Sequence, residues 1–111
     1  MDTTAVQNDN SAEIARLNDG ARDNAVHYIA TRGILSLDPE IISKIYNSVQ
    51  NFKDFTEDND PYGEHDFGSL TVAGNKVFWK IDYYNQELSG WCDPLSPDCH
   101  RILTIMLAEE Y

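Results

Sequence analysis

Apolar residues recur three or four positions apart in the segment that follows Leu37. The pair Asp38-Pro39 is typical of a helix start, because Asp can accept hydrogen bonds from free backbone N–H groups and Pro suits the first helical position. The apolar side chains that follow would share one helix face: Ile41, Ile42, Ile45, Tyr46, Val49 and Phe52. The pattern therefore predicts a helix at about 38–53, with this face toward the core.

Alternation of apolar and polar residues predicts a β-hairpin at 69–84. The pair Gly74-Asn75 suits a tight turn of the primed type. A turn at this pair fixes the register and places these residues opposite one another: Ala73 and Lys76, Val72 and Val77, Leu70 and Trp79. We expect one apolar face of the hairpin to pack against helix 38–53, formed by Leu70, Val72, Val77, Trp79 and Ile81.

Weaker patterns predict elements toward both ends of the chain. Asn10, followed by an acidic residue three positions later, resembles a helix N-cap with its capping partner, and Gly20 is a suitable helix end. Residues 25–31 are rich in β-formers and predict a strand. The segment 101–107 predicts a last strand, with a short helix capped by Asp98 as the alternative.

These elements predict an α+β fold. We expect a small antiparallel sheet of three to four strands, including the hairpin 69–84, packed against the helix at about 38–53, plus a short N-terminal helix. A length of 111 residues suits one domain. The sequence therefore predicts a flexible N-terminus at 1–10 and a single α+β domain at 11–111.

The chain is strongly acidic, which bears on its partners. Eight Lys and Arg face nineteen Asp and Glu, for a formal net charge of −11. Such a surface repels nucleic acid and anionic membranes and attracts basic protein surfaces, although the charge is also compatible with a role in solubility alone. No run approaches the roughly 20 apolar residues of a membrane span and no signal-peptide pattern opens the chain, so we expect a cytoplasmic protein.

Acidic residues are concentrated in one segment, 54–66, which also holds His65. Its six acids are Asp54, Glu57, Asp58, Asp60, Glu64 and Asp66. From Asp58 onward the spacing partly fits a calcium-binding loop, but Ser69 occupies the twelfth position, where such loops carry a bidentate Glu. We therefore expect no metal site here.

Catalysis and simple folding are the other interpretations of this segment. His65 could act as a general base with Glu64 and Asp66 beside it, but neighbouring residues of a strand point to opposite faces. Cys92, Cys99 and His100 match no common zinc spacing, so we predict no catalytic residue and no cofactor. Alternatively, Asp and Asn side chains of the loop hydrogen-bond their own backbone and fix a compact turn.

Three longer motifs resemble the bacterial domain of unknown function 3768 family. They are DFTEDNDPYGEHDFG, WKIDYY and the C-terminal RILTIMLAEEY, and the similarity also includes LND at 17–19 and LDPE at 37–40. The resemblance implies no known reaction. It implies a small acidic protein of plasmids, prophages and chromosomes, a profile shared with unrelated anti-restriction and anti-CRISPR proteins. The family usually carries Ser or Thr at Cys92 and Cys99, which argues against a shared cysteine metal site.

Our leading hypothesis is an acidic inhibitor of a nucleic-acid-binding defence complex, acting as a nucleic-acid mimic or by covering a basic surface. Alternate strand residues lie about 6.6 Å apart, near the phosphate spacing of one nucleic-acid chain. The candidate partner-binding residues are Asp54, Glu57, Asp58, Asp60, Glu64, Asp66, Glu87, Asp93, Glu109 and Glu110. The alternative is a housekeeping domain or metal-binding hydrolase that uses Asp58, Asp60, Glu64, His65 and Asp66.

Overall fold

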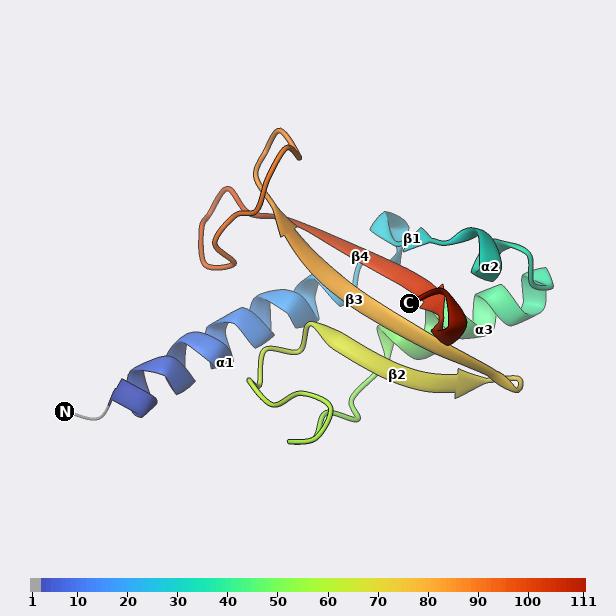
Figure 1. Cartoon of the computed structure of the whole chain (residues 1–111), viewed down its shortest axis with the longest axis horizontal. Coiled ribbons are helices and arrows are strands. Elements are labelled where there is room, and N and C mark those ends of the chain that lie inside the picture. Colours follow the sequence, from blue (N-terminus) through green and yellow to red (C-terminus); the bar gives the residue numbers. More distant parts are fainter. Residues whose placement is uncertain (1–2) are drawn as a thin grey trace.

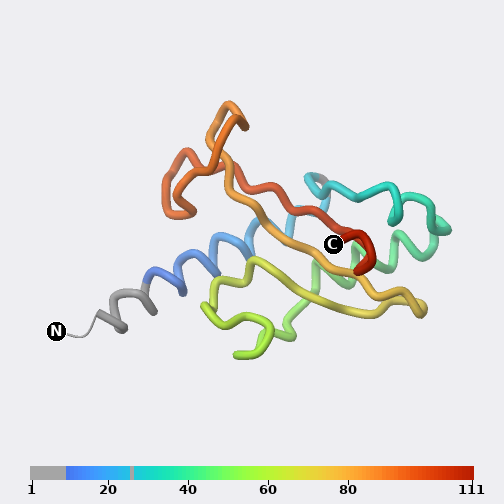
Figure 2. Tube along the Cα trace, in the orientation of Figure 1, coloured from blue at the N-terminus to red at the C-terminus, as the bar shows by residue number. Residues whose placement is uncertain are grey.

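The computed structural model describes residues 3–111, with side chains for 10–25 and 27–111. Figure 1 shows an α+β arrangement, and Figure 2 traces the same path. The helices are α1 (Thr3–Arg22), α2 (Arg32–Leu35) and α3 (Pro39–Gln50), with 3₁₀ turns η1 (Ala25–His27) and η2 (Ala108–Glu110). The strands are β1 (Ile29–Ala30), β2 (Phe67–Val72), β3 (Asn75–Tyr84) and β4 (His100–Leu107). Within this described part, no helix has both the length and the apolar character that crossing a membrane requires.

The four strands form one sheet in the order β1-β4-β3-β2. The pairs β2–β3 and β3–β4 are antiparallel, as expected, whereas β1 is parallel to β4, so the sheet is mixed. The strand predicted at 25–31 is reduced to Ile29–Ala30, and Ala25–His27 form a 3₁₀ turn instead. This turn redirects the chain from the end of α1 toward the sheet within a few residues.

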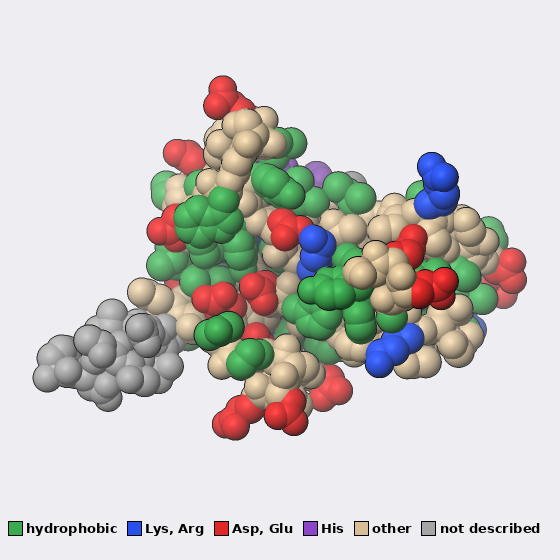
Figure 3. All heavy atoms as spheres, viewed as in Figure 1, with side chains coloured by type: hydrophobic (Ala, Val, Ile, Leu, Met, Phe, Trp, Pro, Cys, Tyr) green, Lys and Arg blue, Asp and Glu red, His purple; other side chains and the backbone are tan. Residues whose placement is uncertain are grey.

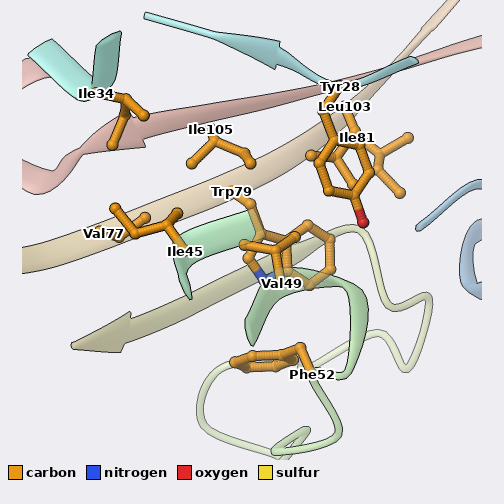
Figure 4. Close-up of a cluster of buried hydrophobic side chains, with 10 residues drawn as sticks. All are labelled: Tyr28, Ile34, Ile45, Val49, Phe52, Val77, Trp79, Ile81, Leu103 and Ile105. Carbon is orange, nitrogen blue, oxygen red and sulfur yellow. The ribbon is translucent and has the colours of Figure 1, made fainter. Parts of the chain in front are cut away.

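Helix α3 confirms the longest predicted helix and covers the inner face of the sheet. Asp38 occupies the N-cap position, but its backbone carbonyl, not its side chain, accepts hydrogen bonds from Ile41 and Ile42. Ile45 and Val49 are fully buried. Figure 4 shows them directed at the sheet residues of the core, and in Figure 1 α3 lies behind the strands.

The hairpin forms, but its predicted register is wrong. The turn is Ala73-Gly74, both with positive φ (50° and 82°), so Val72 lies opposite Asn75 and Leu70 opposite Val77. Packing across the strands explains this choice, because Gly68 now faces Trp79. A Cβ at Gly68 would lie 2.2 Å from the indole nitrogen, so only Gly fits there.

The register error leaves the predicted apolar face intact. Each residue of β2 pairs two positions away from its expected partner, and a shift of two keeps every side chain on its original face. Val77, Trp79 and Ile81 are buried in the core, and Leu70 and Val72 pack against it. The segment 101–107 is strand β4, as predicted, rather than a helix. The inner face therefore holds the residues that the alternation predicted.

Helix α1 extends beyond its predicted limits. It begins at Thr3 and ends at Arg22, so Asn10 is not an N-cap and Gly20 does not end the helix. Glu13 pairs with Arg16 at 2.6 Å, one turn along the helix, rather than with the backbone near Asn10. Residues 1–2 lie outside the described part, and the flexibility expected of 1–10 stays a prediction.

Candidate functional site

The acidic segment 54–66 is a loop whose own polar side chains fix its path. Asn59 accepts a hydrogen bond from the Thr56 N–H at 2.8 Å and donates to the Asp54 carbonyl at 2.8 Å. The Asp60 N–H donates to the Thr56 carbonyl at 2.8 Å. These contacts confirm the interpretation in which the loop's Asn and Asp side chains hold its backbone.

Asp60 serves the fold from inside the loop. Its side chain is only 7% exposed, and its carboxylate accepts hydrogen bonds from the backbone N–H groups of Glu64 and His65 at 3.2–3.3 Å. His65 has a positive φ of 57°, an uncommon backbone conformation for a residue other than Gly. Asp60 therefore stabilises the bend that leads into β2.

His65 lies between the carboxylates of Asp19 and Asp60, and not between those of its sequence neighbours Glu64 and Asp66. Its Nδ1 is 2.9 Å from Asp19 Oδ1, and its Nε2 is 3.7 Å from Asp60 Oδ2. The ring stacks on Phe55 with centroids 3.8 Å apart and an angle of 2°. A general base needs one ring nitrogen directed at its substrate, and here both nitrogens face carboxylates. This geometry favours a positioning role for His65 in the fold.

Asn18 of α1 joins the loop to the sheet. It is fully buried and its side-chain amide donates to the Glu64 carbonyl at 2.9 Å and to the Tyr83 hydroxyl at 2.9 Å. Its oxygen accepts from Arg101 Nε at 2.6 Å, and Arg101 Nη2 donates to the Pro94 carbonyl at 2.6 Å. We call Asn18, Tyr83, Arg101 and the Glu64 carbonyl the polar hub. It links α1, the acidic loop, β3, β4 and the loop that precedes β4.

Two carboxylates beside the polar hub, those of Glu64 and Asp66, have no cationic side chain within the described part of the chain to balance their charge. Burial raises the pKa of Glu64, with Asp66 and Asp60 adding to the effect. Burial also raises the pKa of Asp66, again with a contribution from Asp60. Among the described residues, the ion pairs and His–carboxylate contacts involve neither Glu64 nor Asp66. The structure thus brings Asp60, Glu64 and Asp66 together and leaves negative charge partly buried there.

The remaining predicted acids are divided between exposed and structural positions. Glu110 is structural, because its carboxylate accepts hydrogen bonds from Thr31 Oγ1, the Leu107 N–H and the Gly33 N–H at 2.6–3.0 Å, and these contacts lower its pKa. Figure 3 shows acidic side chains at several separate places on the face drawn, with hydrophobic and neutral groups between them. The exposed acids are Asp54, Glu57, Asp58, Glu87, Asp93 and Glu109.

A groove lies between α1 and the two loops that the polar hub connects. Its volume is about 520 Å³. One wall comes from α1 near Ile14, another from the acidic loop and the third from the loop before β4. We call it the α1 groove, and its principal lining residues are Ile14, Pro61, Tyr62, Glu64, Asp93 and Leu95.

The side chains of the acidic loop and the two cysteines are not arranged as metal ligands in the part of the chain that the structure describes. In the described part of the chain, no three His, Cys, Asp or Glu side chains gather in a metal-binding arrangement. Asp60, the third position of the calcium-type spacing, directs its oxygens at backbone N–H groups. Cys92 and Cys99 are free, half-buried thiols. Asp60 is therefore already used by the fold.

Several site residues could not be found from the acidic segment alone. Asn18 and Asp19 lie in the LND motif, and Tyr83 lies in WKIDYY. Both motifs contribute to the family resemblance, but neither indicates what these residues do in the fold. A single sequence does not show which polar residue of a helix becomes buried, because the partners of Asn18 lie 46, 65 and 83 residues away.

Comparison with known proteins places the chain in a family. A search of curated proteins and a search of solved structures each returned no match. A family model described as a protein of unknown function, DUF3768, matches residues 30–110, which is more than half of the chain. The match includes the acidic loop, the hairpin and β4 but begins after α1. The chain belongs to the DUF3768 family.

Proposed function

We propose that this protein is an acidic anti-CRISPR or anti-restriction protein, which binds and inhibits a nucleic-acid-binding defence complex. It does so by occupying a basic surface on that complex, where nucleic acid would otherwise lie. The observation that carries the proposal is the exposed set Asp54, Glu57 and Asp58, presented by a loop whose backbone Asn59 and Asp60 hold in place.

A loop held in this way supports binding because its charges are already arranged. A flexible acidic segment would lose conformational entropy when it meets a basic surface, and an ordered one loses less. None of these three carboxylates takes part in an ion pair among the described residues. They are free to meet Lys and Arg side chains of a partner.

The structure narrows the set of candidate contact residues. Asp60 and Glu110 hold the fold through hydrogen bonds, so they are unsuited to partner contacts. The narrower set keeps the exposed acids Asp54, Glu57, Asp58, Glu87, Asp93 and Glu109 and the half-buried Glu64. Because the acids are separated on the drawn face, the proposal favours covering a basic surface over copying a long run of phosphates.

The experiment is competition with DNA on purified restriction and CRISPR effector complexes. We expect the protein to displace a labelled duplex from its target complex, with an affinity that falls about tenfold or more between low and moderate salt. The triple amide variant Asp54→Asn, Glu57→Gln, Asp58→Asn should weaken binding further and leave the fold intact.

The matched control makes the same charge change elsewhere. Asp38→Asn, Glu40→Gln and Asp98→Asn alter three exposed acids whose side chains make no hydrogen bond within the part of the chain that the structure describes. If both triple variants lose affinity equally, only net charge matters and the loop has no special role. Simultaneous binding of DNA and the protein at full affinity would exclude occupation of the DNA site.

A further inference from the structure

We infer that the α1 groove binds an Arg or Lys side chain of a basic partner segment, which enters with its aliphatic stem along the groove and its charged group near Glu64 and Asp93. This inference rests on the proposed function, since it names the feature of the basic partner that the acidic protein recognises.

The lining of the α1 groove matches such a side chain. Ile14, Pro61 and Leu95 offer apolar surface, and Glu64 and Asp93 add two carboxylates. Lys and Arg combine an apolar stem with a cationic end, so they gain from both kinds of surface at once. Tyr62, a residue that is 79% exposed, can also meet a cation over its ring.

The charge of the α1 groove lacks an internal partner. Glu64 and Asp93 make no ion pair among the described residues. Arg101 of the polar hub does not line the groove, and its guanidinium donates to the Asn18 side-chain oxygen and to the Pro94 carbonyl. A half-buried carboxylate without a cation is unfavourable, and an incoming guanidinium or ammonium relieves that cost. Charge complementarity therefore selects a basic occupant.

The polar hub fixes the two acidic walls relative to each other. Asn18 holds the backbone of Glu64, and Arg101 holds the backbone of Pro94, which lies between Asp93 and Leu95. Asn18 and Arg101 are themselves joined at 2.6 Å. Asp93 Oδ1 accepts from the Leu95 N–H at 2.9 Å, which leaves Asp93 Oδ2 for a ligand. One buried amide thus sets the width of the site, and little ordering is needed when a side chain enters.

The probe is a fluorescent peptide with four Arg residues separated by Gly and Ser, compared with the same peptide carrying citrulline, a neutral analogue of similar shape. We expect the arginine peptide to bind and the citrulline peptide to bind at least about tenfold more weakly, because charge-assisted hydrogen bonds are lost. In NMR spectra, the backbone signals of Glu64, Asp93 and Leu95 should shift on addition of the arginine peptide.

Matched variants separate the α1 groove from the general acidic field. The groove variant Glu64→Gln, Asp93→Asn and the control variant Asp38→Asn, Glu40→Gln change the net charge equally. We expect the groove variant to lose about tenfold or more in peptide affinity and the control variant less than about threefold. Tyr62→Ala, which changes no charge, should weaken binding about two- to fivefold. Melting curves check that each variant is folded.

Several results would overturn the inference. Equal binding of the citrulline peptide, or equal losses in the groove and control variants, would show that the α1 groove does not select a cation. Calcium or magnesium that competes with the peptide and shifts the same signals would indicate a metal site instead. If a defence complex binds and the groove variant retains full affinity, this inference fails and the proposed function stands. If the peptide binds the groove and no complex is displaced from DNA, the reverse holds.

Discussion

The layer between α3 and the sheet and the polar hub beneath α1 hold this fold by different means. The layer is apolar, and five of its side chains are fully buried: Ile45, Val49, Val77, Trp79 and Ile105. Its stability depends on the area and volume of these side chains, and neighbouring groups of similar size can partly replace one another. The layer therefore tolerates substitutions that keep its volume, but removing a large side chain from it costs much stability.

The polar hub depends on direction rather than volume. Each polar atom of the Asn18 amide faces a partner, and those partners come from the acidic loop, β3 and β4. No other residue type offers the same donors and acceptor at that position. The difference between the two regions suggests that the apolar layer provides most of the free energy of folding, while the polar hub determines where the acidic loop lies.

The largest expected loss comes from emptying the apolar layer. Trp79→Ala should lower the free energy of unfolding by about 3–5 kcal/mol, because a fully buried aromatic side chain leaves a cavity. Urea denaturation monitored by circular dichroism measures it. Phe78, next in the chain but half-buried on the outer face, is the matched control, and Phe78→Ala should cost roughly 1–2 kcal/mol. Equal losses at the two positions would mean that the inner face is not the main core.

The apolar layer could be predicted from the sequence because local patterns encode it. The spacing in α3 and the alternation in β3 each define a face without reference to the rest of the chain. The hairpin register could not be predicted in the same way. Gly68 faces Trp79, and the clash that any other residue would cause is visible only when both strands are in place. A local turn signal at Gly74-Asn75 was overridden by this packing.

The candidate site was predicted only in outline. The concentration of acids at 54–66 is evident in the sequence, yet Asp58 and Asp60, two residues apart, occupy different environments. Asp58 is exposed, whereas Asp60 turns inward to accept backbone N–H groups because the chain bends through Gly63 and His65, both with positive φ. The groove could not be predicted, since its walls come from three segments that the polar hub brings together.

Removing the centre of the polar hub should have the next largest effect. Asn18→Ala should lower the free energy of unfolding by about 2–4 kcal/mol, because the Glu64 carbonyl and Arg101 lose partners in a buried environment. Tyr83→Phe removes a single hydroxyl and should cost only about 1 kcal/mol. Thermal and urea denaturation give both values.

A second measurement tests whether the polar hub positions the acidic loop. In Asn18→Ala, hydrogen exchange should become faster at the backbone amides of residues 62–65 and of Asp93 and Leu95, in the two loops that the polar hub holds. The amides of β3 should keep their protection relative to the lowered global stability. Uniform acceleration across the chain would show that Asn18 contributes only to overall stability and does not organise the two loops.

The smallest effect concerns pH and has opposite signs at two acids. Burial, followed by Asp60, raises the pKa of Asp66, so the folded state binds that proton more tightly than the unfolded state does, and ionised Asp66 destabilises the fold at neutral pH. Asp66→Asn should therefore raise stability at pH 7 relative to the parent protein. This gain should shrink as pH falls through the raised pKa, where the parent Asp66 also becomes neutral. Asn keeps an oxygen for the Tyr83 hydroxyl, so the comparison isolates the charge.

Glu110 supplies the control of opposite sign. Hydrogen bonds from Thr31, Leu107 and Gly33 lower its pKa, so its ionised form stabilises the fold above the ordinary Glu pKa and this contribution is lost as pH falls through the lowered value. Glu110→Gln should therefore lower stability at pH 7 and approach the parent protein in acid. Urea denaturation of the three proteins from pH 3 to pH 7 measures both differences. If the stability difference between Asp66→Asn and the parent protein does not change with pH, the Asp66 carboxylate is solvated in the fold. That result would contradict the conclusion that uncompensated negative charge lies beside the polar hub.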